Sequence, residues 1–281
     1  MNQVICGDCL NVMRGMEDDS VDLVFGSPPY EDARTPIDDP FNVYKGQDWV
    51  DWMVDVYVES LRVCRGLVAF VVQGRTHKFR WSATPALLMA DLHRAGVHLR
   101  DCAFFNRVGV PGSGGPDWLR HDVEYIICAT NGGRLPWSDN TALGHPPKWN
   151  PGGDMSYRMQ NGRRIAKLHT KNDGNKKTVQ GYNPPKKANP GNLIHCDVGG
   201  GRMGSMLAHE NEAPFPEVLS DFMVLSFCPP GGVVLDPFGG SGTTMASAIK
   251  NGRNSVSIDV RESQVSLIRK RIQEVENEGK S

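Results

Sequence analysis

Short apolar runs alternate with stretches of helical periodicity along much of the chain. Val21–Gly26 and Leu67–Val72 are rich in β-branched and aromatic residues and have strand length, which predicts buried strands of a parallel sheet. Asp48–Arg65 has apolar residues at helical spacing behind a capping aspartate, and Gly66 ends it. This order of strands and helices predicts an α/β fold.

The remaining elements follow the same pattern up to an irregular middle segment. Strands are expected at 4–8, 102–105, 125–128, 233–235 and 255–259, and helices at 9–16, 83–95, 216–228, 243–250 and 261–277. Between Gly132 and Asn192 the periodicity fades, and Pro, Gly, Asn and Lys dominate. We therefore expect one α/β domain in two halves, 1–133 and 193–281, with an insertion at 134–192.

Composition agrees with one large α/β domain, since 39% of the 281 residues are hydrophobic and 22% are charged. Leu67–Val72 is far too short to cross a membrane, and the start of the chain lacks a signal-peptide pattern. Seven mostly scattered cysteines predict reduced thiols and a cytoplasmic location. Cys6 and Cys9 form one CxxC without a second pair at zinc spacing, so we expect no metal site.

The charge is distributed unevenly, although the formal net charge is only −1. Residues 134–190 contain eleven Lys and Arg against three Asp and Glu, which leaves about −9 elsewhere. Trp137, Trp149, Tyr157 and Tyr182 are interleaved with these cations. Positive side chains between aromatic faces suit nucleic-acid phosphates and bases, and a solubilising or flexible insertion is the alternative.

The segment Ser27-Pro28-Pro29-Tyr30 directly follows the strand expected at 21–26. Neither proline has an N–H, so the segment forms a stiff, extended corner at the carboxyl end of a strand. Ligands bind at that edge in open α/β sheets. The hydroxyl, the aromatic ring and the freed carbonyls could hold a planar base and accept hydrogen bonds from its amino group. A surface proline turn is the alternative.

A second candidate site begins at Asp236, where a predicted strand runs into a glycine-rich turn and a helix. The glycines allow a ligand to approach the backbone, and the helix N-terminus offers N–H groups to an anion. Asp259, 23 residues further on, can hold ribose hydroxyls, and Asp236 suits a cationic amino group. The turn is neither GxGxxG nor a P-loop, so the pattern favours a ligand with ribose, carboxylate and ammonium, namely S-adenosylmethionine.

Together, Ser27–Tyr30 (SPPY) and Asp236–Thr243 (DPFGGSGT) resemble the motifs of β-class amino-methylating DNA methyltransferases of restriction–modification systems. His209–Pro216 (HENEAPFP) is similar to the segment that precedes the cofactor motif in that family. The resemblance implies a Rossmann-like, S-adenosylmethionine-dependent methyltransferase fold with a mainly parallel seven-stranded sheet and a circularly permuted motif order. It implies a catalytic half at 1–133, a target-recognition region at 134–192 and a cofactor-binding half at 193–281.

The resemblance also implies roles for individual residues. Ser27, Pro28, Pro29 and Tyr30 would hold the flipped base, with Tyr30 stacked on its ring. The residues implied to bind the cofactor are Asp8, Phe215, Asp236, Phe238, Gly239, Gly240, Ser241, Gly242, Thr243 and Asp259. Ordinary core packing is the alternative for the two phenylalanines. The residues implied to contact double-stranded DNA are Arg158, Arg163, Arg164, Lys176 and Lys177.

The target base is the finer question. A serine at position 27 favours N4 of cytosine, because aspartate is commoner there in enzymes that methylate N6 of adenine; adenine stays open as the alternative. The alternative to an enzyme is a DNA-binding protein that has the same fold but no catalytic activity. A methyltransferase acting on a protein amide would have the opposite motif order. The resemblance leaves open a cognate restriction endonuclease and a homodimer as partners, and we expect no membrane association.

Overall fold

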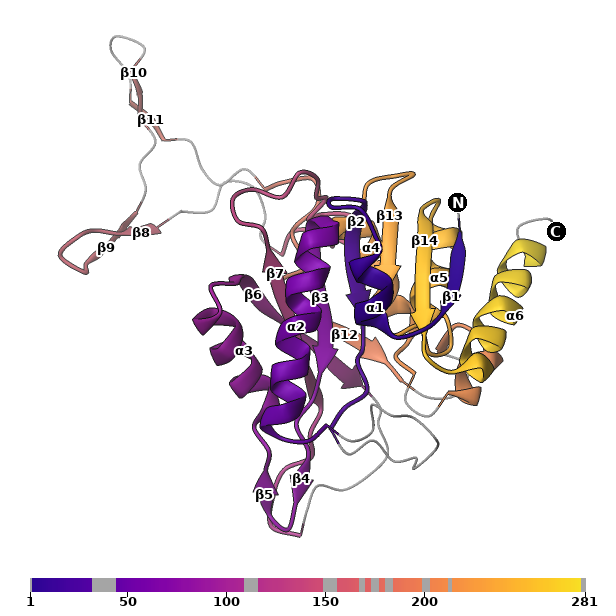
Figure 1. Cartoon of the computed structure of the whole chain (residues 1–281). Helices are drawn as coiled ribbons and strands as arrows, with labels where there is room; N and C mark the ends of the chain where they lie inside the picture. Colours follow the sequence, from indigo (N-terminus) through magenta and orange to yellow (C-terminus); the bar gives the residue numbers. More distant parts are fainter. Residues whose placement is uncertain are drawn as a thin grey trace. The chain divides into compact units, whose positions relative to one another are not determined.

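The computed structural model describes residues 2–31, 44–108, 116–148, 156–166, 170–172, 177–179, 184–198, 203–211 and 214–278 (Figure 1). The chain divides into two compact units. The first consists of Met1–Asp139 and Gly191–Ser281, and the second is Asn140–Pro190.

A single large sheet forms the centre of the first unit. Its eight strands among the described residues run in the order β1 (Gln3–Cys6), β14 (Asn254–Asp259), β13 (Val233–Asp236), β2 (Val21–Gly26), β3 (Cys64–Val72), β7 (Val123–Thr130), β6 (His98–Val108) and β12 (Leu193–Asp197). The first five are parallel to one another, and β7 is antiparallel to both of its neighbours. The mainly parallel α/β fold is therefore confirmed.

The expected number of seven strands was one too few, because β12 adds an edge strand parallel to β6. Its five residues alternate between exposed and buried, with Ile194 and Cys196 facing the core. The segment follows directly on the irregular, polar stretch and has only two core-facing side chains. The local sequence therefore gives little indication that this segment pairs with a distant strand.

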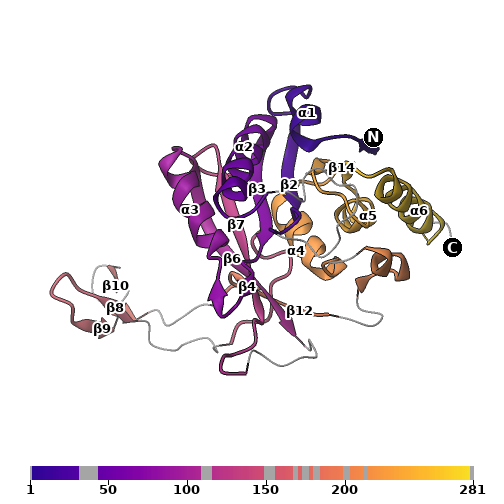
Figure 2. The same cartoon turned by 60° about the horizontal axis from the view of Figure 1, so that its bottom comes forward.

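Helices cover both faces of the sheet (Figures 1 and 2). On one face lie α1 (Cys9–Arg14), α2 (Gln47–Val63) and α3 (Thr84–Arg94). On the other lie α4 (Glu217–Phe227), α5 (Thr243–Lys250) and α6 (Glu262–Glu278). Every residue of β2 is buried, as expected of a strand covered on both faces. None of the described helices is long and apolar enough to span a bilayer.

The connections diverge between β13 and β2. From β13 the chain passes through α5 to β14 on one side, whereas from β2 it passes through α2 to β3 on the other. The carboxyl ends of these adjacent parallel strands therefore form a topological switch point, where open α/β sheets bind ligands. Ser27 follows β2 and Asp236 ends β13, so both sequence motifs reach this point.

Two short strands after β3, β4 (Thr76–His77) and β5 (Arg80–Trp81), form a hairpin that the sequence pattern did not predict. Its two turn residues, Lys78 and Phe79, have φ angles of 47° and 63°. Such left-handed backbone costs about 1–2 kcal/mol for each non-glycine residue. The turn carries neither of the residues, Asn and Gly, that two-residue hairpin turns favour.

Two small antiparallel hairpins lie among the described residues of the second unit. One pairs β8 (Ser156–Arg158) with β9 (Arg164–Ala166), and the other pairs β10 (Thr170–Asn172) with β11 (Lys177–Val179). An isolated bridge joins His145 to Ala188. The unit lies within the segment 134–192 that the sequence pattern marked as an insertion without periodic elements.

Candidate active site

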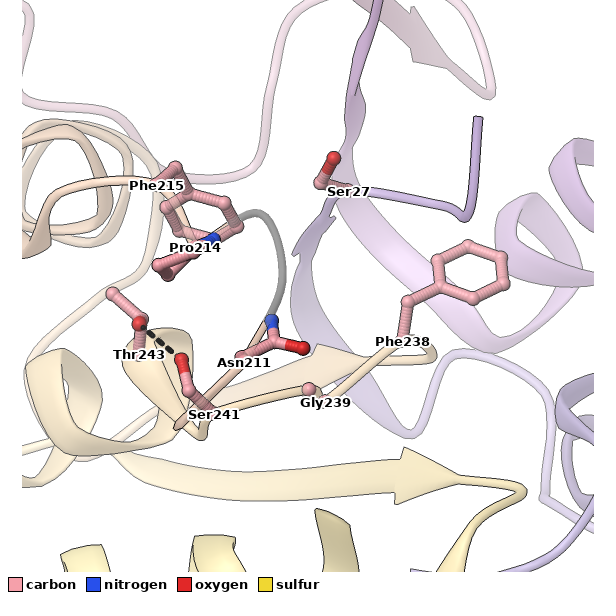
Figure 3. Close-up of a pocket in the computed structure, with 9 residues that line it drawn as sticks. Ser27, Asn211, Pro214, Phe215, Phe238, Gly239, Ser241 and Thr243 are labelled. Atoms are coloured by element: carbon pink, nitrogen blue, oxygen red, sulfur yellow. Dashed lines mark hydrogen bonds between the residues drawn. The ribbon is translucent and has the colours of Figure 1, made fainter. Parts of the chain in front are cut away.

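A pocket of about 270 Å³, including the part open to solvent, lies at the carboxyl edge of the sheet (Figure 3). Its lining comes from the end of β2, from the segment before α4 and from the turn between β13 and α5. The lining residues are Ser27, Asn211, Pro214, Phe215, Phe238, Gly239, Gly240, Ser241 and Thr243. Figure 3 shows Ser27 across the pocket from Gly239 and Ser241, so motifs more than 200 residues apart in sequence share one cavity.

The glycine-rich turn forms one wall of this pocket, and two of its residues have no room for a side chain. A Cβ on Gly239 would overlap the Ser257 hydroxyl, and a Cβ on Gly240 would lie 2.9 Å from Asn211 Nδ2. Gly240 and Gly242 have φ angles of +50° and +76°, which favour glycine. The turn thereby exposes backbone next to the N-terminus of α5, an arrangement that suits an anionic group.

A buried cation lies behind this wall. The Arg271 side chain, from α6, is 1% exposed and donates to Glu217 Oε2 at 2.8 Å and to Thr243 Oγ1 at 3.2 Å. Lys250 Nζ lies 2.9 Å from the other oxygen of Glu217. Thr243 in turn lies 3.1 Å from the Ser241 hydroxyl. Arg271 therefore fixes the Thr243 hydroxyl directly and the Ser241 hydroxyl through Thr243, and both residues line the pocket. The sequence did not indicate this role, because Arg271 is one of many charged residues in the last helix.

Asp236 connects the two motifs, although it does not line the pocket. Its carboxylate is almost completely buried and accepts a hydrogen bond from the Phe238 N–H at 3.0 Å. A Cβ on Gly26 would overlap the same carboxylate oxygen, so glycine at the end of β2 leaves room for the Asp236 side chain. Burial, with a smaller contribution from the negative charge of Asp259, raises the pKa of Asp236 to about 7. A cationic ligand group nearby would stabilise its ionised form.

The other two predicted carboxylates stand at neighbouring strand ends, outside the pocket lining. Asp259 Oδ2 accepts from the Gly240 N–H at 2.9 Å, and Oδ1 accepts from the Arg261 N–H at 3.0 Å. Asp8 caps α1 by accepting from the Asn11 N–H at 2.9 Å. Asp259 therefore holds the glycine-rich turn in place.

The SPPY corner is fixed from several sides. The Ser27 hydroxyl lies 3.2 Å from the Val71 carbonyl, to which it donates, and 3.5 Å from the Tyr30 hydroxyl. The Pro29 carbonyl accepts from the Trp49 indole N–H at 2.8 Å. The Pro28 carbonyl accepts no hydrogen bond from the described part of the chain, which leaves it available to a ligand. Of the four residues, Ser27 lines the pocket.

Tyr30 is held by a polar network that the sequence did not reveal. Its hydroxyl donates to Glu124 Oε2 at 2.7 Å, and the other oxygen of Glu124 lies 3.1 Å from Arg107. Burial, together with the negative charge of Glu124, raises the pKa of Tyr30 well above its ordinary value. The phenol therefore stays neutral, and its ring is fixed beside Ser27. Glu124 and Arg107 lie on two antiparallel strands, β7 and β6, and carry no motif.

Two phenylalanines form the apolar walls of the pocket. Phe215 packs edge-on against Phe25 with ring centroids 5.5 Å apart. Phe238 packs in the same way against Trp52 at 5.7 Å and Phe70 at 5.6 Å. Each ring therefore both packs on the core and lines the cavity. Asn211 and Pro214, from the motif before α4, line the pocket too and were not singled out by the sequence.

The cations expected to contact DNA lie in the second unit. Arg163 is exposed, and its backbone N–H donates to Asn161 Oδ1 at 3.1 Å. The backbones of Arg158, Arg164 and Lys177 belong to the hairpin strands, and their side chains lie outside what the structure describes. Lys176 lies outside the described residues.

The comparisons with known proteins agree on one family. The sequence model of a protein family described as DNA methylase matches residues 21–270 of this chain. The orphan methyltransferase M.BamHII of Bacillus amyloliquefaciens is 26% identical over 262 residues, covering 91% of this chain and 89% of that protein. The DNA adenine methyltransferase YhdJ of Escherichia coli strain K12 is 23% identical over 279 residues, covering 94% and 80%.

Solved structures share the fold. The PvuII DNA methyltransferase, described as cytosine-N4-specific, matches with a TM-score of 0.68 over 99% of this chain and 91% of its own, at 16% identity. A DNA modification methylase of Thermus thermophilus, complexed with S-adenosyl-L-methionine, matches with a TM-score of 0.60 over 98% and 96%, at 18% identity.

The pocket fits this cofactor on its own chemistry. The exposed glycine backbone and the α5 N-terminus suit a carboxylate, and the two phenylalanines suit an adenosyl group. Since the family model covers most of the chain, the chain belongs to the amino-methylating DNA methylases, the family of restriction–modification methyltransferases that act on N4 of cytosine or N6 of adenine with S-adenosyl-L-methionine as cofactor.

Proposed function

We propose that the target of this DNA methyltransferase is the N4 amino nitrogen of a cytosine flipped out of the duplex. The observation that carries the proposal is Ser27, whose hydroxyl lines the pocket opposite the glycine-rich turn. A hydroxyl can donate to N3 of cytosine or accept from an amino N–H, whereas an ionised aspartate can only accept. The relatives leave both bases open, since PvuII is described as cytosine-N4-specific and YhdJ as an adenine methyltransferase.

Flipping is required because the exocyclic amino group is otherwise paired, and it costs a few kcal/mol. Tyr30, with its hydroxyl held by Glu124, offers a ring on which the flipped base can stack. The Pro28 carbonyl then accepts a hydrogen bond from the amino N–H, while the Ser27 hydroxyl accepts from the amino group or donates to the neighbouring ring nitrogen N3. These contacts localise the nitrogen lone pair, which is otherwise delocalised into the ring, and so make the nitrogen a better nucleophile.

S-adenosylmethionine supplies a methyl group made electrophilic by its attachment to a positively charged sulfur. The glycine-rich turn, with Gly239 to Thr243, would hold the methionine carboxylate, and Asp236 would favour the ammonium group. Asp259 would hold the ribose hydroxyls, and Asp8 would lie near the adenine amino group. Phe215 and Phe238 would pack on the adenosyl part. Positioning and electrostatics, without a covalent enzyme intermediate, then carry the methyl transfer.

Residues 134–192 are proposed to recognise the DNA sequence. Arg158, Arg163, Arg164, Lys176 and Lys177 would supply phosphate or base contacts in the manner of other basic segments. The halves 1–133 and 193–281 would carry the catalytic and cofactor motifs. A cognate endonuclease or a second copy of the chain would be a further partner.

The test is expression in a bacterial host that lacks its own DNA methyltransferases, followed by single-molecule sequencing of the host DNA. N4-methylcytosine in one sequence context supports the proposal. N6-methyladenine would replace cytosine by adenine without changing the site. If the DNA carried no modification and the purified protein failed to bind S-adenosylmethionine in a titration, a catalytically silent DNA-binding protein would be the better account.

A further inference from the structure

The β4–β5 hairpin projects from the edge of the sheet at which the pocket lies. It follows directly on the carboxyl end of β3, the neighbour of β2 in the sheet. In Figure 1 it extends beyond the lower edge, toward which the arrows of β13 and β14 point, and Figure 2 brings the same edge forward. Ser27 follows the carboxyl end of β2, so the hairpin and Ser27 belong to the same edge of the sheet.

The hairpin is basic and presents an aromatic ring to solvent. Arg75, His77, Lys78 and Arg80 lie within six residues, and residues 73–90 contain no Asp or Glu. The Phe79 side chain at the tip is 81% exposed. Cations around an exposed aromatic ring suit a nucleic acid, whose phosphates attract the charges and whose bases stack on the ring.

The tip is strained, and the Phe79 side chain packs little against the described part of the chain. Lys78 and Phe79 both have left-handed backbone, with φ angles of 47° and 63°. Asn-Gly adopts this conformation at a lower energetic cost. Phe79 is a bulky residue for such a conformation. Because its ring is mostly in solvent, its burial does not offset the strain, which points to a function for that side chain.

The base of the hairpin is firmly attached to the sheet. The Trp81 ring stacks on Tyr125 with centroids 6.5 Å apart and an interplanar angle of 25°. The Arg75 N–H donates to Ser82 Oγ at 3.0 Å, and the Ser82 N–H donates to the Arg75 carbonyl at 2.8 Å. Tyr125 is adjacent in sequence to Glu124, which holds Tyr30. The hairpin is therefore fixed to the strand that also positions the base-binding corner.

We propose that the β4–β5 hairpin binds the DNA duplex beside the target base, with Lys78 and Arg80 on backbone phosphates and Phe79 against the base stack opened by flipping. An apolar side chain pressed between base steps is a general way to hold distorted DNA. The inference rests on DNA being the substrate, as in the function proposed above. It adds a contact outside residues 134–192.

The test compares Phe79→Gly, the double variant Lys78→Asn with Phe79→Gly, Lys78→Ala and Arg80→Ala with wild type. Val58→Ala and Lys270→Ala are matched controls, because both residues are exposed and lie on helices. Three quantities are measured: kcat/KM for methyl transfer to unmethylated bacteriophage DNA, the Kd of a random 30-bp duplex at several salt concentrations, and thermal stability.

The two glycine variants should lose about tenfold in kcat/KM, about 1.4 kcal/mol, while their melting temperature stays equal or rises as the turn relaxes. Lys78→Ala and Arg80→Ala should each weaken duplex binding and reduce the slope of log K against log salt by about 1. Affinity for S-adenosylmethionine should not change. Glycine variants that lose stability, or variants that methylate and bind like wild type, would overturn the inference. A wild-type protein that neither binds nor methylates DNA would instead overturn the proposed function, and the inference with it.

Discussion

Asp236→Asn should make the protein more stable at neutral pH. Asp236 is 2% exposed at the end of β13, and its burial raises the pKa to about 7. The amide of asparagine retains an oxygen for the Phe238 N–H but cannot ionise. The variant therefore removes the cost of holding a charge in this position and leaves the local hydrogen bond in place.

The size of the effect follows from linkage between protonation and folding. The pKa rises from an ordinary 3.8 to about 7 on folding, and a shift of about three units corresponds to roughly 4 kcal/mol. Because the folded-state pKa is the higher one, this contribution is fully present below about pH 4 and is lost as pH rises through 7. Between pH 5 and pH 8, about 2–3 kcal/mol of it should disappear in wild type and stay constant in the variant.

Urea or thermal unfolding of both proteins at pH 5, 6, 7 and 8 measures this difference directly. The melting temperature of wild type should fall relative to the variant by about 5–10 °C across that range. Asp117→Asn, at an exposed position, is the control and should follow wild type. Parallel pH profiles for wild type and Asp236→Asn would show that the Asp236 carboxyl does not have a raised pKa in the folded protein. In addition, the variant should bind S-adenosylmethionine more weakly, because the amide cannot pair with its ammonium group.

Three further predictions address the rest of the site. Arg271→Met removes the buried partner of Glu217 Oε2 while Lys250 stays beside the other oxygen, and it should lower the free energy of unfolding by about 2–3 kcal/mol. Adding Glu217→Gln should recover part of the loss; urea titration measures both variants, and equal losses would contradict the pairing. Gly26→Ala forces a Cβ onto Asp236 and should lower stability by about 1–3 kcal/mol and weaken cofactor binding, as melting curves and calorimetry would show; an unchanged protein would contradict the contact. Tyr30→Ala should slow methylation and leave cofactor affinity unchanged, whereas Asp259→Ala should mainly weaken cofactor affinity. Equal loss of cofactor binding in both variants would contradict the assignment of Tyr30 to the base and Asp259 to the cofactor.

Most of the first unit could be predicted because its elements carry local signals. The strands at 21–26 and 67–72 and the helices at 83–95, 216–228, 243–250 and 261–277 are found within a few residues of their expected bounds. Apolar runs and glycine or proline at their ends are properties of consecutive residues. The apolar runs indicated a parallel sheet, and the family resemblance implied its mainly parallel order and the permuted order of the motifs.

The missed features depend on contacts between distant residues. Glu124 and Arg271 look like ordinary charged residues in a strand and a helix, and only packing shows that one holds Tyr30 and the other Thr243. The β4–β5 hairpin has Lys78 and Phe79 in its turn instead of Asn-Gly, so the sequence carried no turn signal and the turn itself is strained. The carboxylates of Asp8 and Asp259 were placed at the correct strand ends, but whether they line the pocket depends on side-chain packing.

We propose that Ser27, at the shared pocket, directs methyl transfer to the amino group of cytosine. The most direct measurement is mass spectrometry of nucleosides from unmethylated DNA incubated with the purified protein and S-adenosylmethionine, with Ser27→Ala as the matched variant. We expect N4-methylcytosine with wild type and at least a tenfold loss of N4-methylcytosine with the variant. N6-methyladenine would contradict the assignment of the base, and equal N4-methylcytosine from both proteins would contradict the role of Ser27.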